Sequence, residues 1–297
     1  GFRPRYFTEM ADEMAEAGLS YAGRTELARN EIELSVPPAQ VPTFQDVRGD
    51  VRAVETLKDY IRNEQQRRDV FVKAEAPDAE AANAEAANAW LSAHTRLLAR
   101  MPATAVQRAI PTMGNQRIPL RGPAFEAIIN AAADQAVTPA EVAAEQSQPA
   151  ERVRRAAVRL LATNQFFLCR EPARGDAPDP TAIAGVTMPG TMNRRTLELA
   201  VTRLVQNQLT APVTGGPAIP VSAIEAVLLQ SVLEAGSFAD APARAAARLA
   251  EESRPLPTPK GQKPGKEITQ DELGEVLDAM RGRKLVNMLR LGIVQPV

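Results

Sequence analysis

The sequence predicts a mainly α-helical protein with small β elements, an α+β fold. Apolar residues recur at helical spacing over several long stretches, while the runs that suit strands are short. Three of the helical stretches open on a serine or threonine followed three residues later by glutamate, which is the signature of a capping box. With 297 residues, of which 44% are apolar, the chain is long enough for two or three domains with their own cores.

The chain opens on an amphipathic helix that is followed at once by a strand. Within residues 4–24, apolar side chains recur at helical spacing from Phe7, and Gly18 stands where a helix ends in the left-handed conformation. The residues from Leu19 onward suit a short strand. Such a unit normally closes a larger α/β sheet. We therefore expect residues 1–30 to be the end of an upstream domain that this chain lacks, or the hinge directly after it.

Residues 31–115 form the expected helical middle domain. The proline-rich stretch 30–50 predicts a surface loop. A helix follows over 50–68, with Asp50 as its N-cap, and residues 69–74 read as a short strand. The inner face of that helix is expected to carry Val51, Val54, Leu57 and Ile61. Residues 75–89 are an alanine-rich stretch of low complexity, and Trp90 after them is expected to anchor a core.

Residues 116–297 form the expected C-terminal domain, a winged-helix-like module with a helical extension. Three helices are predicted, at 123–135, 138–146 and 148–165, and the run FFLCRE follows them as a strand. Three helices with a short middle one and then a strand is the order of a winged helix-turn-helix. The extension continues with helices that begin near Asn193, at Ser222 and at Thr269, and the second of these is apolar nearly all round.

Composition excludes several classes of site. The net charge of −1 and the pI near 6.1 show no basic surplus, so a nucleic-acid partner is disfavoured. With Cys169 and His94 as the single cysteine and histidine, neither an intrachain disulfide nor a classical zinc site can form. Cys169 reads as a small buried residue and His94 as an ordinary helix residue. We therefore assign no metal site to this chain.

Targeting and nucleotide-binding signals are also missing. No apolar run reaches the roughly 18 residues of a membrane helix, and no signal peptide stands at the start, so we expect a soluble, cytoplasmic protein without a membrane partner. The glycine-containing runs at 112–119, 173–178 and 213–220 lack the spacing of a phosphate-binding turn and read as loops. We assign no catalytic and no cofactor-binding residues to this chain.

Two groups of arginines are candidate contacts for a partner or substrate. Arg67 and Arg68 could bind an anion or another domain, although cations at a helix C-terminus are also favourable by themselves. Arg152, Arg155 and Arg159 share one face of the third helix in the winged-helix-like module. That face would enter the major groove in a DNA reader, or it could be solvated, or it could contact a protein.

The opening residues resemble a family. The pattern AxxGLxYxGxxxL is matched by Ala15, Gly18, Leu19, Tyr21, Gly23 and Leu27. It resembles the point where bacterial class I methyltransferases pass into a methyltransferase regulatory domain. The segment ETLKDYIRNEQQRRDVFVK is similar to the helix and strand that follow in that family, although RRDVFV departs from its usual pair of an aromatic and a basic residue before the strand. The C-terminal half resembles the C-terminal module of protein lysine methyltransferase-like proteins, known from rickettsial enzymes that modify outer-membrane proteins.

The resemblance implies an S-adenosylmethionine-dependent methyltransferase with a catalytic Rossmann-like domain in cis, upstream of residue 1. This chain would then be the non-catalytic portion that regulates the enzyme or recognises a protein substrate, the target being a lysine. S-adenosylmethionine would bind the parent protein and not this chain. Two alternatives stay open: a winged-helix DNA-binding regulator and a helical scaffold for another protein.

Overall fold

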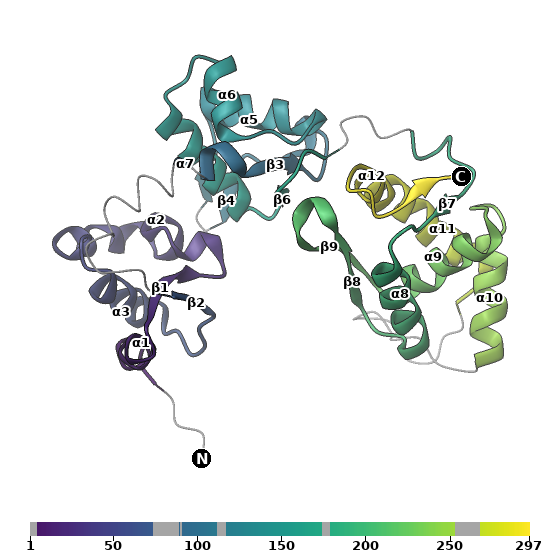
Figure 1. Cartoon of the computed structure of the whole chain (residues 1–297), viewed down its shortest axis with the longest axis horizontal. Helices are drawn as coiled ribbons and strands as arrows, with labels where there is room; N and C mark the ends of the chain where they lie inside the picture. The colour runs from purple at the N-terminus through teal and green to yellow at the C-terminus, as the bar shows by residue number, and fades with distance from the viewer. Residues whose placement is uncertain (1–4, 74–88, 90, 112–116, 174–178, 253–267) are drawn as a thin grey trace. The chain divides into compact units, whose positions relative to one another are not determined.

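The computed structural model describes residues 5–73, 89, 91–111, 117–173, 179–252 and 268–297, which form two compact units (Figure 1). The first unit comprises residues 1–95, 103–130 and 138–166. The second comprises residues 96–102, 131–137 and 167–297. Helices dominate, and the described strands pair in two-stranded sheets, so the predicted fold class is confirmed. The division at residues 30 and 115 stays a prediction. The alanine-rich stretch 75–88, Trp90 and the runs 112–116 and 174–178 lie outside the described residues.

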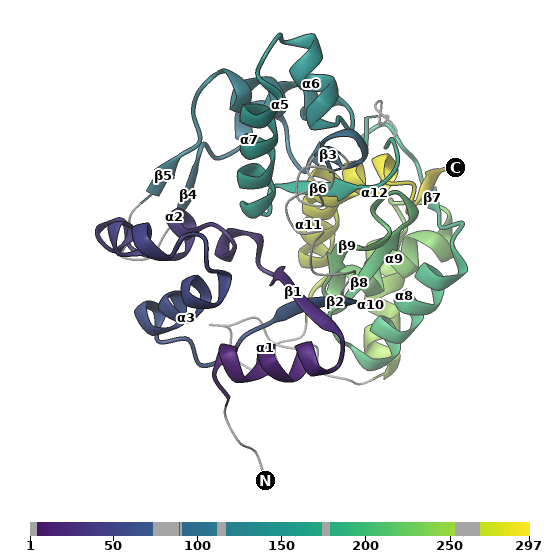
Figure 2. The same ribbon diagram turned by 60° about the vertical axis from the view of Figure 1, so that its left-hand side comes forward.

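The opening helix and strand form as predicted. Helix α1 spans Phe7–Glu16 and strand β1 spans Leu19–Arg24, with Gly18 between them at φ +74°. Strand β1 pairs in antiparallel fashion with β2 (Asp69–Lys73), and a bulge lies between Tyr21 and Gly23 (Figure 2). The opening strand therefore finds its partner about 50 residues later in the same chain, a pairing that local sequence cannot indicate.

The stretch 30–50 is more helical than expected. It contains α2 (Ile32–Ser35) and the 3₁₀ segment η2 (Pro38–Val47), after the short 3₁₀ turn η1 (Leu27–Arg29). The prediction of an irregular loop was wrong. Pro38 can stand at the first helical position because that position needs no N–H donor. Val36 and Phe44, both 0% exposed, then pack with Val54 and hold these turns against the next helix.

Helix α3 spans Val51–Arg62 and is shorter than the predicted 50–68. Asp50 caps it as expected, because its carboxylate accepts hydrogen bonds from the backbone N–H groups of Arg52 and Ala53. Asn63 adopts the left-handed conformation at φ 50° and ends the helix. Val51 is 56% exposed and was wrongly assigned to the inner face. At the first turn of a helix, spacing alone does not show which side meets the core.

The order of elements predicted for the winged-helix-like module is present. The hairpin of β4 and β5 leads into three helices, and β6 follows. That these elements form a winged helix stays a prediction. The elements are β4 (Ala109–Pro111), β5 (Arg117–Pro119), α5 (Pro123–Asp134), α6 (Pro139–Glu145), α7 (Ala150–Ala162) and β6 (Phe166–Cys169). Thr138 and Glu141 form the predicted capping box at α6. The 3₁₀ turn η4 (Ala103–Ala105) precedes the hairpin.

The second unit is built around α9 (Ala223–Ala235), a helix that contacts α8, α10 and α11 (Figures 1 and 2). Ser222 and Gly236 begin and end α9 as predicted. Its burial confirms the all-round apolar pattern: Leu228 and Leu229 are 0% exposed. The other elements are β3 (Arg96–Ala99), β7 (Val186–Thr187), α8 (Thr191–Arg203), β8 (Asn207–Ala211), η5 (Pro212–Thr214), β9 (Gly216–Val221), α10 (Ala241–Glu252), α11 (Gln270–Met280), the π-helical turn η6 (Arg281–Leu285), α12 (Val286–Arg290) and β10 (Gln295–Pro296).

Candidate functional site

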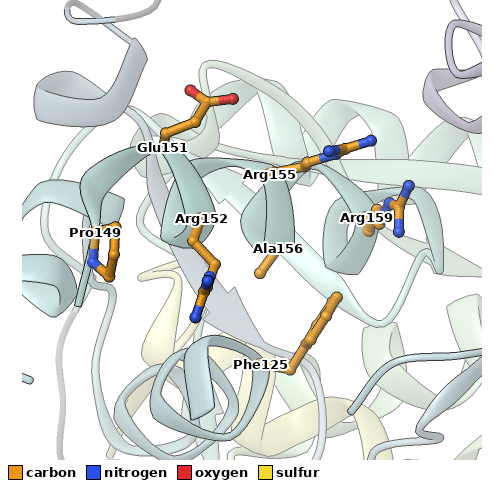
Figure 3. A pocket seen from close by; sticks show the side chains of 7 residues that line it. All are labelled: Phe125, Pro149, Glu151, Arg152, Arg155, Ala156 and Arg159. Atoms are coloured by element: carbon orange, nitrogen blue, oxygen red, sulfur yellow. The ribbon is translucent and has the colours of Figure 1, made fainter. Parts of the chain in front are cut away.

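The arginines predicted on one helix face line a pocket in the first unit. Pro149 precedes α7, and from there Arg152, Arg155 and Arg159 follow at spacings of three and four residues, which places them on one side of the helix. We call the pocket of about 520 Å³ that they line the arginine pocket. Its lining is Phe125, Pro149, Glu151, Arg152, Arg155, Ala156 and Arg159 (Figure 3).

The arginine pocket combines cationic walls with an apolar base. Phe125 belongs to α5, and Figure 3 shows its ring directed toward α7, between Arg152 and Arg159. Ala156 faces the same space and is 3% exposed, so the helix surface at its centre is apolar. The carboxylate of Glu151 points away from Phe125 in Figure 3. Such a pocket suits a ligand that carries both an apolar group and negative charge.

The three arginines differ in their partners. Arg159 forms an ion pair with Glu31, with 2.8 Å between Nε and Oε2, and its side chain is 19% exposed. Arg152 and Arg155 are exposed, and among the residues described here no carboxylate lies at ion-pair distance from either. The carboxylate of Glu151 is instead bound by Arg154 at 2.7 Å. Arg152 and Arg155 are therefore the two guanidinium groups of this face that are available to a ligand.

The other predicted pair, Arg67 and Arg68, is split between the interior and the surface. Arg67 donates to Glu55, Asp59 and Asp69 over 2.6–2.9 Å. Its guanidinium also lies 4.2 Å from the centre of the Phe7 ring. Burial lowers the pKa of Arg67, but the hydrogen bonds to Asp69 and Asp59 outweigh it and raise the pKa above its usual value. Arg68 is 80% exposed and lies 3.5 Å from Glu26.

Arg67 belongs to a buried ion network that sequence reasoning missed. Its members are Arg24, Glu55, Lys58, Asp59, Glu64, Arg67 and Asp69, and Arg29 and Arg62 also pair with Glu64 at its edge. Arg24, at the end of β1, is 1% exposed and binds Glu55 at 3.0 Å, Glu64 at 3.2 Å and Asp59. Lys58 donates to Glu55 at 2.7 Å and to the carbonyl of Arg29 at 2.9 Å.

The charges of the network are stabilised by one another. Burial raises the pKa of Glu55, but hydrogen bonds and charges from Lys58 and Arg24 hold it below its usual value. Burial lowers the pKa of Lys58. The alternation Glu55, Lys58, Asp59 along α3 was the available sequence signal, yet an amphipathic helix with a solvated face shows the same pattern.

A second hollow, of about 730 Å³, lies beside the network. Its apolar lining comes from α1 with its N-cap residue, from α3 and from β2: Tyr6, Phe7, Met10, Met14, Tyr60 and Phe71. Arg67, Asp59 and Asp69 also line it, and Arg67 forms an ion pair with each of the two aspartates. This hollow therefore presents aromatic surface with charges that are already paired.

Chemical groups for catalysis are not gathered in the described part of the chain. Cys169 is buried, and burial raises the pKa of its thiol to about 11, which keeps it protonated at neutral pH. Within the described ranges, no group of three or more His, Cys, Asp or Glu side chains is arranged to hold a metal ion. None of the helices described is both long and apolar enough to cross a bilayer.

The family comparison confirms the resemblance seen in the opening residues. Residues 1–73 match the family model of a predicted methyltransferase regulatory domain. These residues contain α1, the pair β1–β2 and the buried ion network. The match links the chain to methyltransferases. No curated protein matches the chain by sequence.

Two solved structures share the fold. One is PKMT2 from Rickettsia typhi in complex with AdoHcy, with 14% identity, a TM-score of 0.51, and coverage of 97% of this chain and 58% of that chain. The other is a second structure of PKMT2 from Rickettsia typhi, also 14% identical, with a TM-score of 0.50 and the same two coverages. At this identity the likeness concerns the fold. This chain spans 58% of the length of the structures that it matches.

Proposed function

We propose that this chain is the non-catalytic regulatory and substrate-recognition portion of an S-adenosylmethionine-dependent methyltransferase that modifies a protein, with lysine as the target residue. The match of residues 1–73 to a methyltransferase regulatory domain carries the proposal. The likeness in fold supports the proposal, because one PKMT2 chain matches 97% of this chain and therefore includes counterparts of both units.

The glycine pair Gly215–Gly216 does not form a turn of the kind that holds a nucleotide cofactor. Nucleotide-type cofactors are usually held at a glycine-rich turn between a strand and a helix. Gly215 instead ends η5 and Gly216 is the first residue of β9, within the β8–β9 hairpin. A Cβ on Gly215 would lie 2.8 Å from the Arg170 side chain, so this turn packs against protein. We propose that S-adenosylmethionine binds a catalytic domain in cis, upstream of this portion, and that the protein acts in the cytoplasm.

The contribution of this portion to the reaction is orientation. Holding two reactants in the right geometry supplies about 7–11 kcal/mol of barrier reduction in favourable cases without any chemical group. Arg24 and Arg67 tie β1, α3 and β2 together through carboxylates, which gives residues 19–73 a defined shape against which another domain can dock.

Calorimetry with S-adenosylhomocysteine tests the proposal. The ligand is titrated into this chain and into a longer product of the same gene that includes upstream sequence. Binding by the longer protein alone is expected, and that protein should transfer labelled methyl groups to lysine in a protein substrate. Binding by this chain alone would contradict its non-catalytic assignment. If neither protein binds S-adenosylhomocysteine, the assignment to a methyltransferase is refuted.

A further inference from the structure

We propose that the arginine pocket binds an acidic segment of a partner protein, with an apolar side chain seated against Phe125 and Ala156 and carboxylates bound by Arg152 and Arg155. The proposal deepens the proposed function, since the segment is taken to belong to the protein substrate. The binding step itself needs neither cofactor nor methyl transfer.

Charge is the first reason. Arg159 is neutralised by Glu31 and Arg154 by Glu151, whereas Arg152 and Arg155 have no carboxylate partner among the described residues. A guanidinium group presents a planar set of donors that matches a carboxylate in two parallel hydrogen bonds. Arg152 and Arg155 are one helical turn apart, so one short acidic segment can reach both.

The apolar base is the second reason. Phe125 and Ala156 come from two helices and line the same pocket, with Arg152 beside them and Pro149 toward one end, while Arg155 is directed away from Phe125 (Figure 3). A ligand of charge alone would leave this surface uncovered. A volume of about 520 Å³ lies within the range of roughly 300–1,000 Å³ that holds small ligands, which is enough for one large side chain with its neighbours.

The surroundings favour an acidic peptide over nucleic acid. Next to the arginine pocket lies a hollow of about 290 Å³ whose lining includes Glu31, Glu33 and Glu151 as well as Arg48, Arg154 and Arg155. The three carboxylates are ion-paired, with Arg159, Arg48 and Arg154. The two guanidinium groups left unpaired among the described residues, Arg152 and Arg155, suit a short acidic peptide, whereas the phosphate backbone of a duplex needs a longer row of cations. The chain's net charge of −1 also produces no overall positive electrostatic potential that would attract a polyanion such as nucleic acid.

Fluorescence anisotropy of a short labelled peptide tests the proposal. The probe carries alternating Glu and Asp around a central Phe. A second peptide replaces every carboxylate by its amide, and a third replaces the central Phe by Ser. The probe is expected to bind the full chain, more weakly as salt is added, and both altered peptides are expected to bind at least about tenfold more weakly.

The matched variants have equal charge. The double variant Arg152→Gln with Arg155→Gln removes the two available guanidinium groups. The control, Arg194→Gln with Arg195→Gln, removes the same charge from exposed positions on α8. We expect about tenfold weaker probe binding in the first and less than twofold change in the second, with unchanged circular dichroism in both because all four side chains are exposed.

Several results would overturn the proposal: no binding of the probe, equal binding by the two double variants, equal binding of the amide or Ser peptide, or arginine-dependent binding of duplex DNA in place of the probe. Because no cofactor is present, these outcomes leave the calorimetric test of the methyltransferase assignment unaffected. Conversely, if the calorimetric test refuted the methyltransferase assignment, binding of the probe would still show that the arginine pocket binds an acidic protein segment.

Discussion

Replacing Arg24 by Met should loosen residues 1–73 strongly. The side chain of Arg24 is 1% exposed and binds three carboxylates, those of Glu55, Asp59 and Glu64. Removing one partner of a buried ion pair costs about 3–5 kcal/mol. The carboxylates keep other cations, such as Arg67 for Glu55 and Arg62 for Glu64, so we expect the lower end, about 3 kcal/mol.

Hydrogen exchange measured by mass spectrometry is the suitable assay, because it reports local opening in a chain with two compact units. A loss of about 3 kcal/mol corresponds to roughly 100-fold faster exchange of the amides in β1 and α3. The control Arg68→Met changes an arginine that is 80% exposed, and it should change exchange less than about twofold. Arg24→Lys keeps the charge but loses the planar set of guanidinium donors, so its exchange rates should lie between those of Arg24→Met and Arg68→Met.

Equal exchange rates in Arg24→Met and Arg68→Met would refute this reasoning. They would mean that the buried ion network does not hold β1 to α3. Faster exchange confined to the second unit would refute it as well, since every partner of Arg24 lies in the first unit.

Three further predictions concern residues 1–73. Burial raises the pKa of Glu55, but Lys58 and Arg24 hold it below its usual value, so the stability that Glu55 contributes is present above its unfolded pKa, near 4.3, and is lost as pH falls through the folded value. The protection of the α3 amides, corrected for the intrinsic exchange rate at each pH, should therefore fall below about pH 4.3, and Glu55→Gln should flatten that dependence. Asp50→Ala removes the cap of α3 and should lower its stability by about 1 kcal/mol, measured by exchange in its first turn, while an unchanged rate would contradict the capping bond. Gly23→Ala should destabilise the β1–β2 pair by at least about 1 kcal/mol, seen as a lower melting temperature, because φ is +142° and a Cβ would meet Asn30 Oδ1 at 2.9 Å; a neutral effect would show that Asn30 moves aside freely.

The sequence determined the features whose causes are local. Gly18 ends α1, Thr138 caps α6, and Ser222 and Thr269 begin α9 and α11, because a cap depends on residues within one turn of one another. The fold class and the likeness of the opening residues to a methyltransferase regulatory domain could be predicted for the same reason, since both rest on short patterns.

Tertiary structure decided the partners of the charges. Arg24 lies 31 residues from Glu55 and 40 from Glu64, and Arg159 lies 128 residues from Glu31. The helical spacing of Arg152, Arg155 and Arg159 predicted a shared face, but not that Phe125 lies beneath it or that Arg159 is neutralised. The sequence does not show whether a given arginine will have a carboxylate partner, because that partner can lie far away along the chain. Only the folded chain brings distant carboxylates near some arginines and leaves Arg152 and Arg155 available to a partner.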